Sequence, residues 1–239
     1  MDPDFSVVAP VFNEAGAVAP LAREIAAAFE GLAYEMIFVD DASLDGTRAV
    51  LVALKADLPA LRVIGHARNA GQSRAIRTGI QAARGAIIVT LDGDGQNDPA
   101  DAPRLAQRLA AAPPGLGLIG GERVRRQDPL AKRLASRMAN AVRGWLLGDQ
   151  ARDSGCGLKA MRREVYLRLP FFDHQHRFLP ALISREGYVV AFEPVGHRAR
   201  RTGVSKYTNL GRLWASVWDI MGVIWLTRRS RSPGKVERL

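Results

Sequence analysis

Two aspartates separated by one glycine, Asp92 and Asp94, offer the clearest chemistry in this sequence. They follow residues 87–91, a continuous apolar run that is typical of a strand buried on both faces. Two carboxylates at this spacing, on a loop whose glycines let the backbone approach closely, can bind a hard divalent cation, which in turn binds a diphosphate. Gln96 offers a further, neutral oxygen ligand. Taken alone, the segment also fits a turn with solvated acids.

Carboxylates also follow the first two strands that the sequence predicts. Residues 5–12 form an apolar segment that is followed by Glu14, and residues 34–39 form another that leads into Asp41. Ligands of open α/β sheets bind just past the carboxyl ends of the strands. We therefore expect these carboxylates and the Asp92 loop to lie together and to form a nucleotide site.

Strands and helices alternate through the first half of the chain. This alternation predicts an α/β fold with a mostly parallel sheet and helices on both faces. The pattern predicts strands over 5–12 (halted at Pro10), 34–39, 61–64 and 87–91, and helices over 18–29, 47–55 and 73–83. Asp45 and Thr47 are predicted to be structural, in a turn that caps the helix over 47–55.

The composition changes after residues 113–115, where a strongly basic second half begins. Apolar residues at helical spacing predict a helix over 132–147. The other predicted elements are strands over 116–121 and 189–193, a loop over 152–157, and a strand followed by a helix over 158–169.

The three loops of the first half, each closing a predicted strand, resemble the nucleotide-sugar domain of family 2 glycosyltransferases, which have the GT-A fold. The spacing from Asp92 to Pro99 is similar to that of the dolichyl- or polyprenyl-phosphate glycosyltransferases, a subgroup typified by dolichol-phosphate mannose synthase. The resemblance implies that Mg²⁺ or Mn²⁺ binds Asp92, Asp94 and Gln96 against the diphosphate of a donor such as GDP-mannose or a UDP-hexose. It also implies that the nucleoside pocket is formed by Pro10, Phe12, Glu14 and Asp41, with Phe12 at a position where the subgroup commonly has tyrosine.

The second half resembles the acceptor half of the same subgroup. The resemblance implies that the acceptor phosphate binds to Arg123, Arg133, Ser154, Arg200 and Lys206. It assigns the catalytic roles to Asp94, Arg123 and Asp153. The loop at 153–157 is closer to a bacterial variant of the subgroup motif, so the equivalence of Ser154 stays open. The implied organisation is one GT-A domain over 1–227 with a nucleotide-sugar half (1–115), an acceptor half (116–209), an interfacial helix (210–227) and a basic tail (228–239).

The implied reaction is an inverting transfer of a mannose- or glucose-like sugar to a polyprenyl or dolichyl phosphate. The acceptor oxygen attacks the anomeric carbon, and metal and arginines stabilise the charge of the departing nucleoside diphosphate. A phosphate is already ionised at neutral pH, so a strong general base is not required, and Asp153 is the candidate for orienting the acceptor. The alternative is a family 2 transferase with a sugar hydroxyl acceptor in cell-envelope polysaccharide synthesis, which would need such a base.

The formal net charge of +10 indicates anionic partners. Nucleic acid is disfavoured because the sequence has no recognition helix, zinc pattern or aromatic RNA platform. Cys156 is the only cysteine, so no intrachain disulfide can form and a reducing compartment is expected. The amino terminus lacks the pattern of a signal peptide, which predicts a cytoplasmic protein.

The most apolar stretch, residues 210–227, is interrupted by Arg212 and Asp219, and no run in the chain is long and apolar enough for a membrane span. Its large apolar side chains recur at helical spacing at Trp214, Trp218, Met221 and Trp225. This pattern predicts a helix that lies in the headgroup layer of the cytoplasmic membrane face, and packing on the protein's own core is the alternative. Many bacterial relatives continue into two membrane spans after this point. This sequence instead resembles the soluble catalytic subunits that need a small membrane partner, so we also expect a small membrane-spanning partner subunit.

Overall fold

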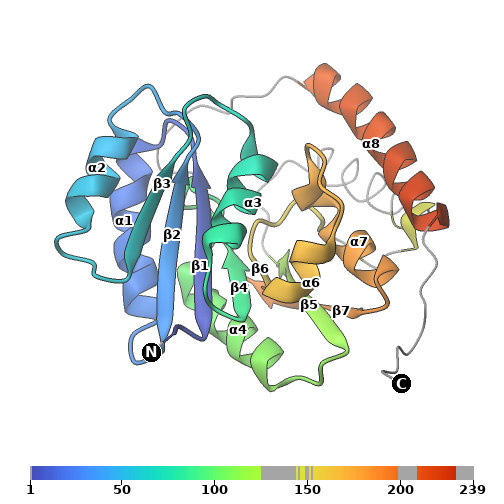
Figure 1. The fold of residues 1–239 in the computed structure, drawn as a ribbon, viewed down its shortest axis with the longest axis horizontal. Coiled ribbons are helices and arrows are strands. Elements are labelled where there is room, and N and C mark those ends of the chain that lie inside the picture. Colours follow the sequence, from blue (N-terminus) through green and yellow to red (C-terminus); the bar gives the residue numbers. More distant parts are fainter. Residues whose placement is uncertain are drawn as a thin grey trace, which may run out of the picture.

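The structure is a computed structural model that describes residues 2–124, 144, 146–148, 151, 153–198 and 209–229, with the backbone alone for 209–216. Its seven-stranded sheet has the order β3-β2-β1-β4-β6-β5-β7 (Figure 1). β6 is antiparallel to both of its neighbours, and every other pair of strands is parallel. The predicted α/β fold with a mostly parallel sheet is confirmed.

The elements follow the predicted order closely in the first half of the chain. The strands are β1 (Phe5–Val11), β2 (Tyr34–Asp40), β3 (Leu61–Gly65), β4 (Ile87–Thr90), β5 (Leu116–Arg123), β6 (Lys159–Arg162) and β7 (Val189–Val195). The α-helices are α1 (Ala15–Ala28), α2 (Thr47–Leu54), α3 (Gln72–Ala82), α4 (Ala102–Ala111), α6 (Arg163–Arg168), α7 (Leu179–Arg185) and α8 (Asn209–Arg229). Two short 3₁₀ helices are η1 (Pro99–Asp101) and η2 (Gln175–Arg177).

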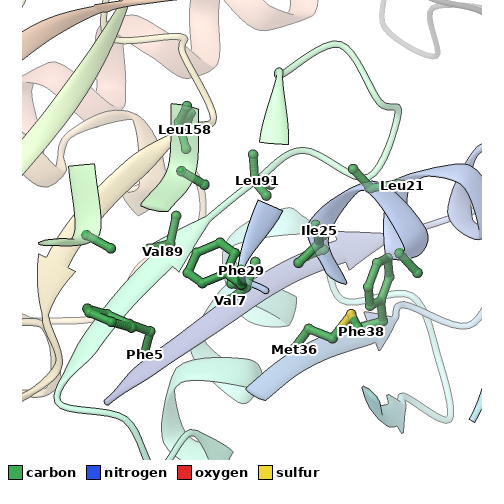
Figure 2. Packing of buried hydrophobic residues seen from close by; sticks show 14 of the residues in the cluster. Phe5, Val7, Leu21, Ile25, Phe29, Met36, Phe38, Val89, Leu91 and Leu158 are labelled. Carbon is green, nitrogen blue, oxygen red and sulfur yellow. The ribbon is translucent and has the colours of Figure 1, made fainter. Parts of the chain in front are cut away.

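Helices cover both faces of the sheet because successive strand residues point to opposite sides. On one face, Val7 and Val89 belong to a core cluster with Ile25 and Phe29 of the α1 segment, and α2 and α4 contribute to the same cluster (Figure 2). On the other face, Val8 belongs to a second cluster that includes residues of α3, α6, α7 and α8. Both faces of the central strands are therefore buried, as their continuous apolar sequences predict.

The prediction that Pro10 halts the first strand is wrong. β1 continues through Pro10 and pairs with β2 as far as Val11. β4 pairs with the other side of β1 only as far as Val8. Proline cannot donate to a ladder, and it is tolerated where a strand has a partner on one side. The strand therefore carries Pro10 to the edge of the sheet at which the loops gather.

The position of β6 is what brings the second half of the chain to that edge. Lys159 lies opposite Thr90 of β4 and opposite Gly120 of β5. Because β6 runs antiparallel to β4, the loop that precedes Lys159 lies beside the loop that follows Thr90. The sequence predicts a strand in this segment but gives no reason to place it between β4 and β5.

A buried carboxylate joins the amino-terminal ends of the strands, opposite the loops. Glu35 is 2% exposed, and it accepts hydrogen bonds from the Ser6 hydroxyl at 2.8 Å, the Arg84 backbone N–H at 2.6 Å and the Arg62 guanidinium. Burial alone would raise the pKa of Glu35, but these hydrogen bonds outweigh it and hold the pKa below its ordinary value.

Helix α8 has an inner and an outer face over residues 217–229. The inner face packs on the second core cluster through Ile220, Val223, Ile224 and Leu226. The outer face exposes Val217, Trp218, Met221 and Trp225, and the two tryptophans are 67% and 60% exposed. The helix therefore packs on the protein's own core, the alternative left open by the sequence, but Trp218 and Trp225 face away from it. The side chain of Trp214 lies outside the described residues. No described helix combines the length and apolar character that crossing a bilayer requires.

Candidate functional site

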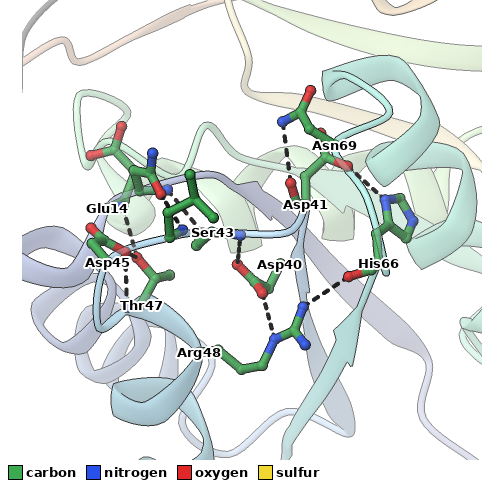
Figure 3. Close-up of polar contacts among 11 residues, drawn as sticks. Glu14, Asp40, Asp41, Ser43, Asp45, Thr47, Arg48, His66 and Asn69 are labelled. Atoms are coloured by element: carbon green, nitrogen blue, oxygen red, sulfur yellow. Dashed lines mark hydrogen bonds and ion pairs between the residues drawn. The ribbon is translucent and has the colours of Figure 1, made fainter.

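The loops that follow β1 and β2 are joined by hydrogen bonds at the carboxyl edge of the sheet (Figure 3). The Asn13 backbone N–H donates to the Ser43 hydroxyl at 2.9 Å, and the Asn13 side-chain oxygen accepts from the Leu44 N–H at 2.7 Å. The Glu14 backbone N–H donates to the Thr47 hydroxyl at 2.8 Å. These bonds hold the half-buried Glu14 next to the second loop.

Asp45 and Thr47 have the structural role that the sequence predicts, and they also reach the first loop. The Asp45 carboxylate accepts hydrogen bonds from the Thr47 N–H at 3.0 Å and from the Ala15 N–H at 3.2 Å. It thus connects the start of α2 to the start of α1. Asp45 therefore also links the loops that precede α1 and α2.

Asp41 is buried and already has protein partners. Its carboxylate accepts from the backbone N–H groups of Ala70 and Gly71 at 2.9 and 2.8 Å. It also lies 2.7 Å from His66 Nδ1 (Figure 3). His66 Nε2 lies 3.0 Å from the Thr78 hydroxyl. Gly71 has φ 88°, a conformation that suits glycine and directs its N–H toward the carboxylate. Asp41 therefore fixes the loop that follows β3, and its contact with a base or ribose stays a prediction.

Asp92 is held by residues from three separate parts of the chain. Its carboxylate accepts from Gln72 Nε2 at 2.9 Å, and its backbone N–H donates to Asn97 Oδ1 at 2.9 Å. On its far side lies Gly157, where an added Cβ would stand only 2.2 Å from Asp92 Oδ2. Asp94 is half-buried and accepts from the Gln96 backbone N–H at 3.0 Å. The predicted metal ligands thus share one short, ordered loop.

The electrostatics of this loop fit a divalent cation. Burial, together with the nearby charge of Asp94, raises the pKa of Asp92 to about 6, although the cations Lys159 and Arg123 act in the opposite direction. Two carboxylates that repel each other, with the amide oxygen of Gln96 nearby in sequence, are hard ligands of the kind that Mg²⁺ and Mn²⁺ prefer. A group of three or more His, Cys, Asp or Glu side chains able to hold a metal is not found among the described residues.

Arg123 and Asp153 form a two-pronged ion pair beside the Asp92 loop. Arg123 Nε and Nη2 donate to the two carboxylate oxygens of Asp153 at 2.6 and 2.7 Å, and the Arg123 backbone N–H donates at 3.3 Å. Burial alone would lower the pKa of Arg123, but the ion pair raises it above its ordinary value. Arg123 is therefore a fixed cation, and the geometry shows Asp153 orienting this guanidinium. The role of Asp153 in orienting the acceptor stays a prediction.

The remaining predicted residues divide by position. Pro10 is buried in β1, and Phe12 and Ser154 are half-buried. Arg133, Arg200 and Lys206 lie outside the described residues. Arg198, two residues before Arg200, forms ion pairs with carboxylates, because its guanidinium pairs with Glu24 and with Asp98, the latter at 2.7 Å.

Four residues that contact this site have no assigned role in the sequence analysis: His66, Gln72, Gly157 and Lys159. The loop before Gln72 has polar and glycine residues that mark it as a connection near the site. No sequence signal links Gly157 to Asp92, because that contact depends on the placement of β6 beside β4.

Comparison with known proteins agrees with this geometry. Residues 6–169 match the model of a family described as glycosyl transferase family 2. The chain is 36% identical over 241 aligned positions to a dodecaprenyl-phosphate galacturonate synthase from Rhizobium johnstonii, with 97% of this chain and 69% of that protein covered. It is 35% identical over 226 positions to an undecaprenyl-phosphate 4-deoxy-4-formamido-L-arabinose transferase from Sodalis glossinidius, with 93% and 68% covered. The chain thus spans about two thirds of the length of these relatives.

Solved structures share the fold at low sequence identity. A glucosyl-3-phosphoglycerate synthase from Mycobacterium tuberculosis in complex with phosphoglyceric acid superposes with a TM-score of 0.70 at 22% identity, covering 97% of this chain and 82% of that chain. A mannosyltransferase from Pyrobaculum calidifontis in complex with GDP-Man and Mn²⁺ superposes with a TM-score of 0.68 at 20% identity, covering 98% and 66%. These likenesses support the GT-A architecture of the sheet.

Proposed function

This chain belongs to glycosyl transferase family 2, and we propose that it transfers a sugar from a nucleotide-diphosphate sugar to the phosphate of a polyprenyl lipid. The observation that carries the proposal is the meeting of the Asp92 loop with Arg123 and the 153–157 loop at one edge of the sheet. A metal-binding pair and a fixed cation within one site suit a reaction between a diphosphate donor and an anionic acceptor. The curated relatives named above use dodecaprenyl or undecaprenyl phosphate, by their names.

The donor is proposed to bind between the first two loops and the Asp92 loop. Phe12 and Glu14 are half-buried in the loop that follows β1, where we propose that they line the nucleoside pocket. Asp92, Asp94 and Gln96 would hold Mg²⁺ or Mn²⁺, which neutralises charge on the diphosphate leaving group. The choice between GDP-mannose and a UDP-hexose is part of the test below.

The acceptor is proposed to bind on the side of Arg123. A guanidinium whose pKa is raised keeps its charge at any physiological pH, and Asp153 prevents it from rotating away from the site. Arg123 then attracts the acceptor phosphate and stabilises the charge that develops during the displacement. The oxygen of the phosphate attacks the anomeric carbon, the bond to the nucleoside diphosphate breaks, and the configuration at that carbon inverts. Arg133, Ser154, Arg200 and Lys206 are proposed to complete the phosphate pocket.

A polyprenyl acceptor keeps its tail in a bilayer, so we propose that the outer face of α8 lies on an anionic membrane surface. Trp218, Met221 and Trp225 supply exposed apolar area, and Arg228 and Arg229 follow at the exposed end of the helix. The Arg229 guanidinium lies 6.0 Å from the Trp225 ring centroid, which places charge beside the aromatic surface. Two basic residues near anionic lipid contribute roughly 2 kcal/mol, which is enough for reversible attachment. Attachment at the cytoplasmic face and a small membrane-spanning partner stay predictions.

The proposal is tested by incubating the full chain with Mn²⁺, labelled GDP-mannose or UDP-hexoses, and undecaprenyl phosphate. Label should enter the lipid phase with at least one donor, and EDTA or Asp94→Ala should abolish the transfer. A screen in which label enters only soluble oligosaccharide with hydroxyl acceptors would favour the alternative reaction. Binding to nucleic acid in the presence of a chelator, without any transfer, would point to a different class of protein.

A further inference from the structure

Lys159 is a buried cation that has no assigned role. Its residue is 5% exposed, and it begins β6 between the ends of β4 and β5. Among the residues that the structure describes, its ammonium has one hydrogen-bond acceptor, the backbone oxygen of Cys156. An ammonium carries three donors, so Lys159 can donate to further acceptors. Burying a charged group without its full set of hydrogen bonds is costly, which favours an additional acceptor at this position.

Lys159 lines a small pocket beside the Asp92 loop. Its polar lining consists of Gln72, Thr90, Asp92, Gly157, His176 and Lys159. Asp92 is the metal ligand proposed above, and Gly157 belongs to the loop that also carries the partner of Arg123. An oxygen of an anion that enters this pocket would therefore lie beside Asp92, which is proposed to hold the metal.

The balance of charge changes when the site is loaded. Lys159 and Asp92 line the same pocket, so the carboxylate partly offsets the charge of the ammonium. A divalent cation on Asp92 and Asp94 would take up much of the charge that now offsets the ammonium. A substrate oxyanion beside Lys159 would restore the balance, so the loaded site favours an anionic group at this position.

We propose that the ammonium of Lys159 binds an oxyanion of a substrate, which is either the acceptor phosphate or a carboxylate on an acidic donor sugar. This inference rests on the proposed function. Both groups offer acceptor oxygens with a full or shared negative charge, and a charge-assisted hydrogen bond in a buried site suits either of them. Lys159 differs from Arg123, which already donates through Nε and Nη2 to Asp153.

The test compares Lys159→Met and Lys159→Gln with the wild-type full chain. Methionine preserves the unbranched shape of the side chain while removing the charge and its donors, so it covers the case in which the glutamine variant folds poorly. Steady-state constants are measured with UDP-glucose and UDP-glucuronate as neutral and acidic donors and with undecaprenyl phosphate as acceptor. The matched control is Arg162→Gln at the other end of β6, where the guanidinium donates to the carbonyl oxygens of Leu116 and Ala112.

A loss of about 10- to 100-fold is expected in kcat/KM for the substrate whose oxyanion the ammonium binds. If the phosphate is that group, KM for undecaprenyl phosphate rises with both donors. If the carboxylate is that group, the loss is confined to UDP-glucuronate. Arg162→Gln should lower the melting temperature without raising KM for undecaprenyl phosphate and without a loss confined to UDP-glucuronate. Lys159 variants that melt earlier but keep wild-type constants for every substrate would overturn the inference while leaving the proposed function intact. A wild type that never glycosylates undecaprenyl phosphate would refute the proposed function instead. The role of Lys159 would then be tested by calorimetric titration of both donors. Equal donor affinities in the wild type and the Lys159 variants would overturn the inference.

Discussion

Gly157→Ala is expected to impair metal-dependent transfer because the methyl group would collide with the carboxylate of Asp92. A Cβ at this position would stand 2.2 Å from Oδ2, 2.3 Å from Cγ and 2.4 Å from Oδ1 of Asp92. Non-bonded heavy atoms are at their optimal separation at about 3.5 Å, so one of the two groups must move by about 1 Å. Asp92 is the movable partner, since Gly157 is held by its carbonyl oxygen, which accepts from the Thr90 hydroxyl at 2.7 Å.

The magnitude follows from this displacement. A misplacement of about 1 Å in a group that positions substrate can cost about 100-fold in rate. Overpacking of this kind also costs about 1–3 kcal/mol of stability. We therefore expect kcat/KM to fall by about 100-fold, with a higher Mn²⁺ concentration for half-maximal activity and a protein that still folds.

Transfer and Mn²⁺ titration measure this effect, and the same loop supplies the control. At Gly155 an added Cβ would lie 3.4 Å from Arg123 Nη2 and 3.9 Å from Asp153 Oδ1, so Gly155→Ala should stay close to wild type. Neither Gly155 nor Gly157 has a positive φ, so the backbone conformation at both positions is open to alanine. If Gly157→Ala keeps the wild-type kcat/KM and metal dependence, the close packing of Gly157 against Asp92 does not control the metal site.

Three further predictions test other parts of the molecule. Asp92→Ala and Asp94→Ala should each abolish transfer and Mn²⁺ binding without lowering the melting temperature, and metal-independent turnover in either variant would count against the metal site. Replacing Trp218 and Trp225 together with serine should reduce sedimentation with anionic vesicles at low salt without unfolding the protein, since both side chains are exposed; an early-melting variant would show that they stabilise the fold. Glu35 has a lowered pKa when folded, so it contributes stability at neutral pH that is lost as the pH falls below its ordinary value near 4.5. Thermal unfolding of Glu35→Gln should accordingly depend less steeply on acid pH than that of the wild type, and identical slopes would refute this role.

Much of the donor half could be predicted from sequence because its signals are local. Each apolar run and the carboxylates that follow it are adjacent in the chain, and parallel strands bring such ends to one edge. The strand that contains Pro10 extends further than predicted, because whether proline ends a strand depends on which neighbour pairs there. That neighbour, β4, is distant in the sequence.

The contacts that complete the site could not be predicted because they depend on tertiary placement. Gln72 and Gly157 reach Asp92 only after α3 docks on the sheet and β6 enters between β4 and β5. The hydrogen bonds from Ala70 and Gly71 to Asp41 likewise depend on how the loop after β3 folds back, and the contact of Asp41 with a nucleoside stays a prediction. The spacing of the tryptophans in α8 predicted one face, but only packing shows that Val223 is buried while Trp218 is exposed.

The most direct test of the central claim is the structure of the product formed from a nucleotide hexose and undecaprenyl phosphate in the presence of Mn²⁺. Mass spectrometry and nuclear magnetic resonance of the extracted lipid would locate the new bond and give its anomeric configuration. We expect a sugar joined to the lipid through one phosphate, with the configuration opposite to that of the donor, and no product from undecaprenol. A sugar attached to a hydroxyl group, or a retained configuration, would contradict it.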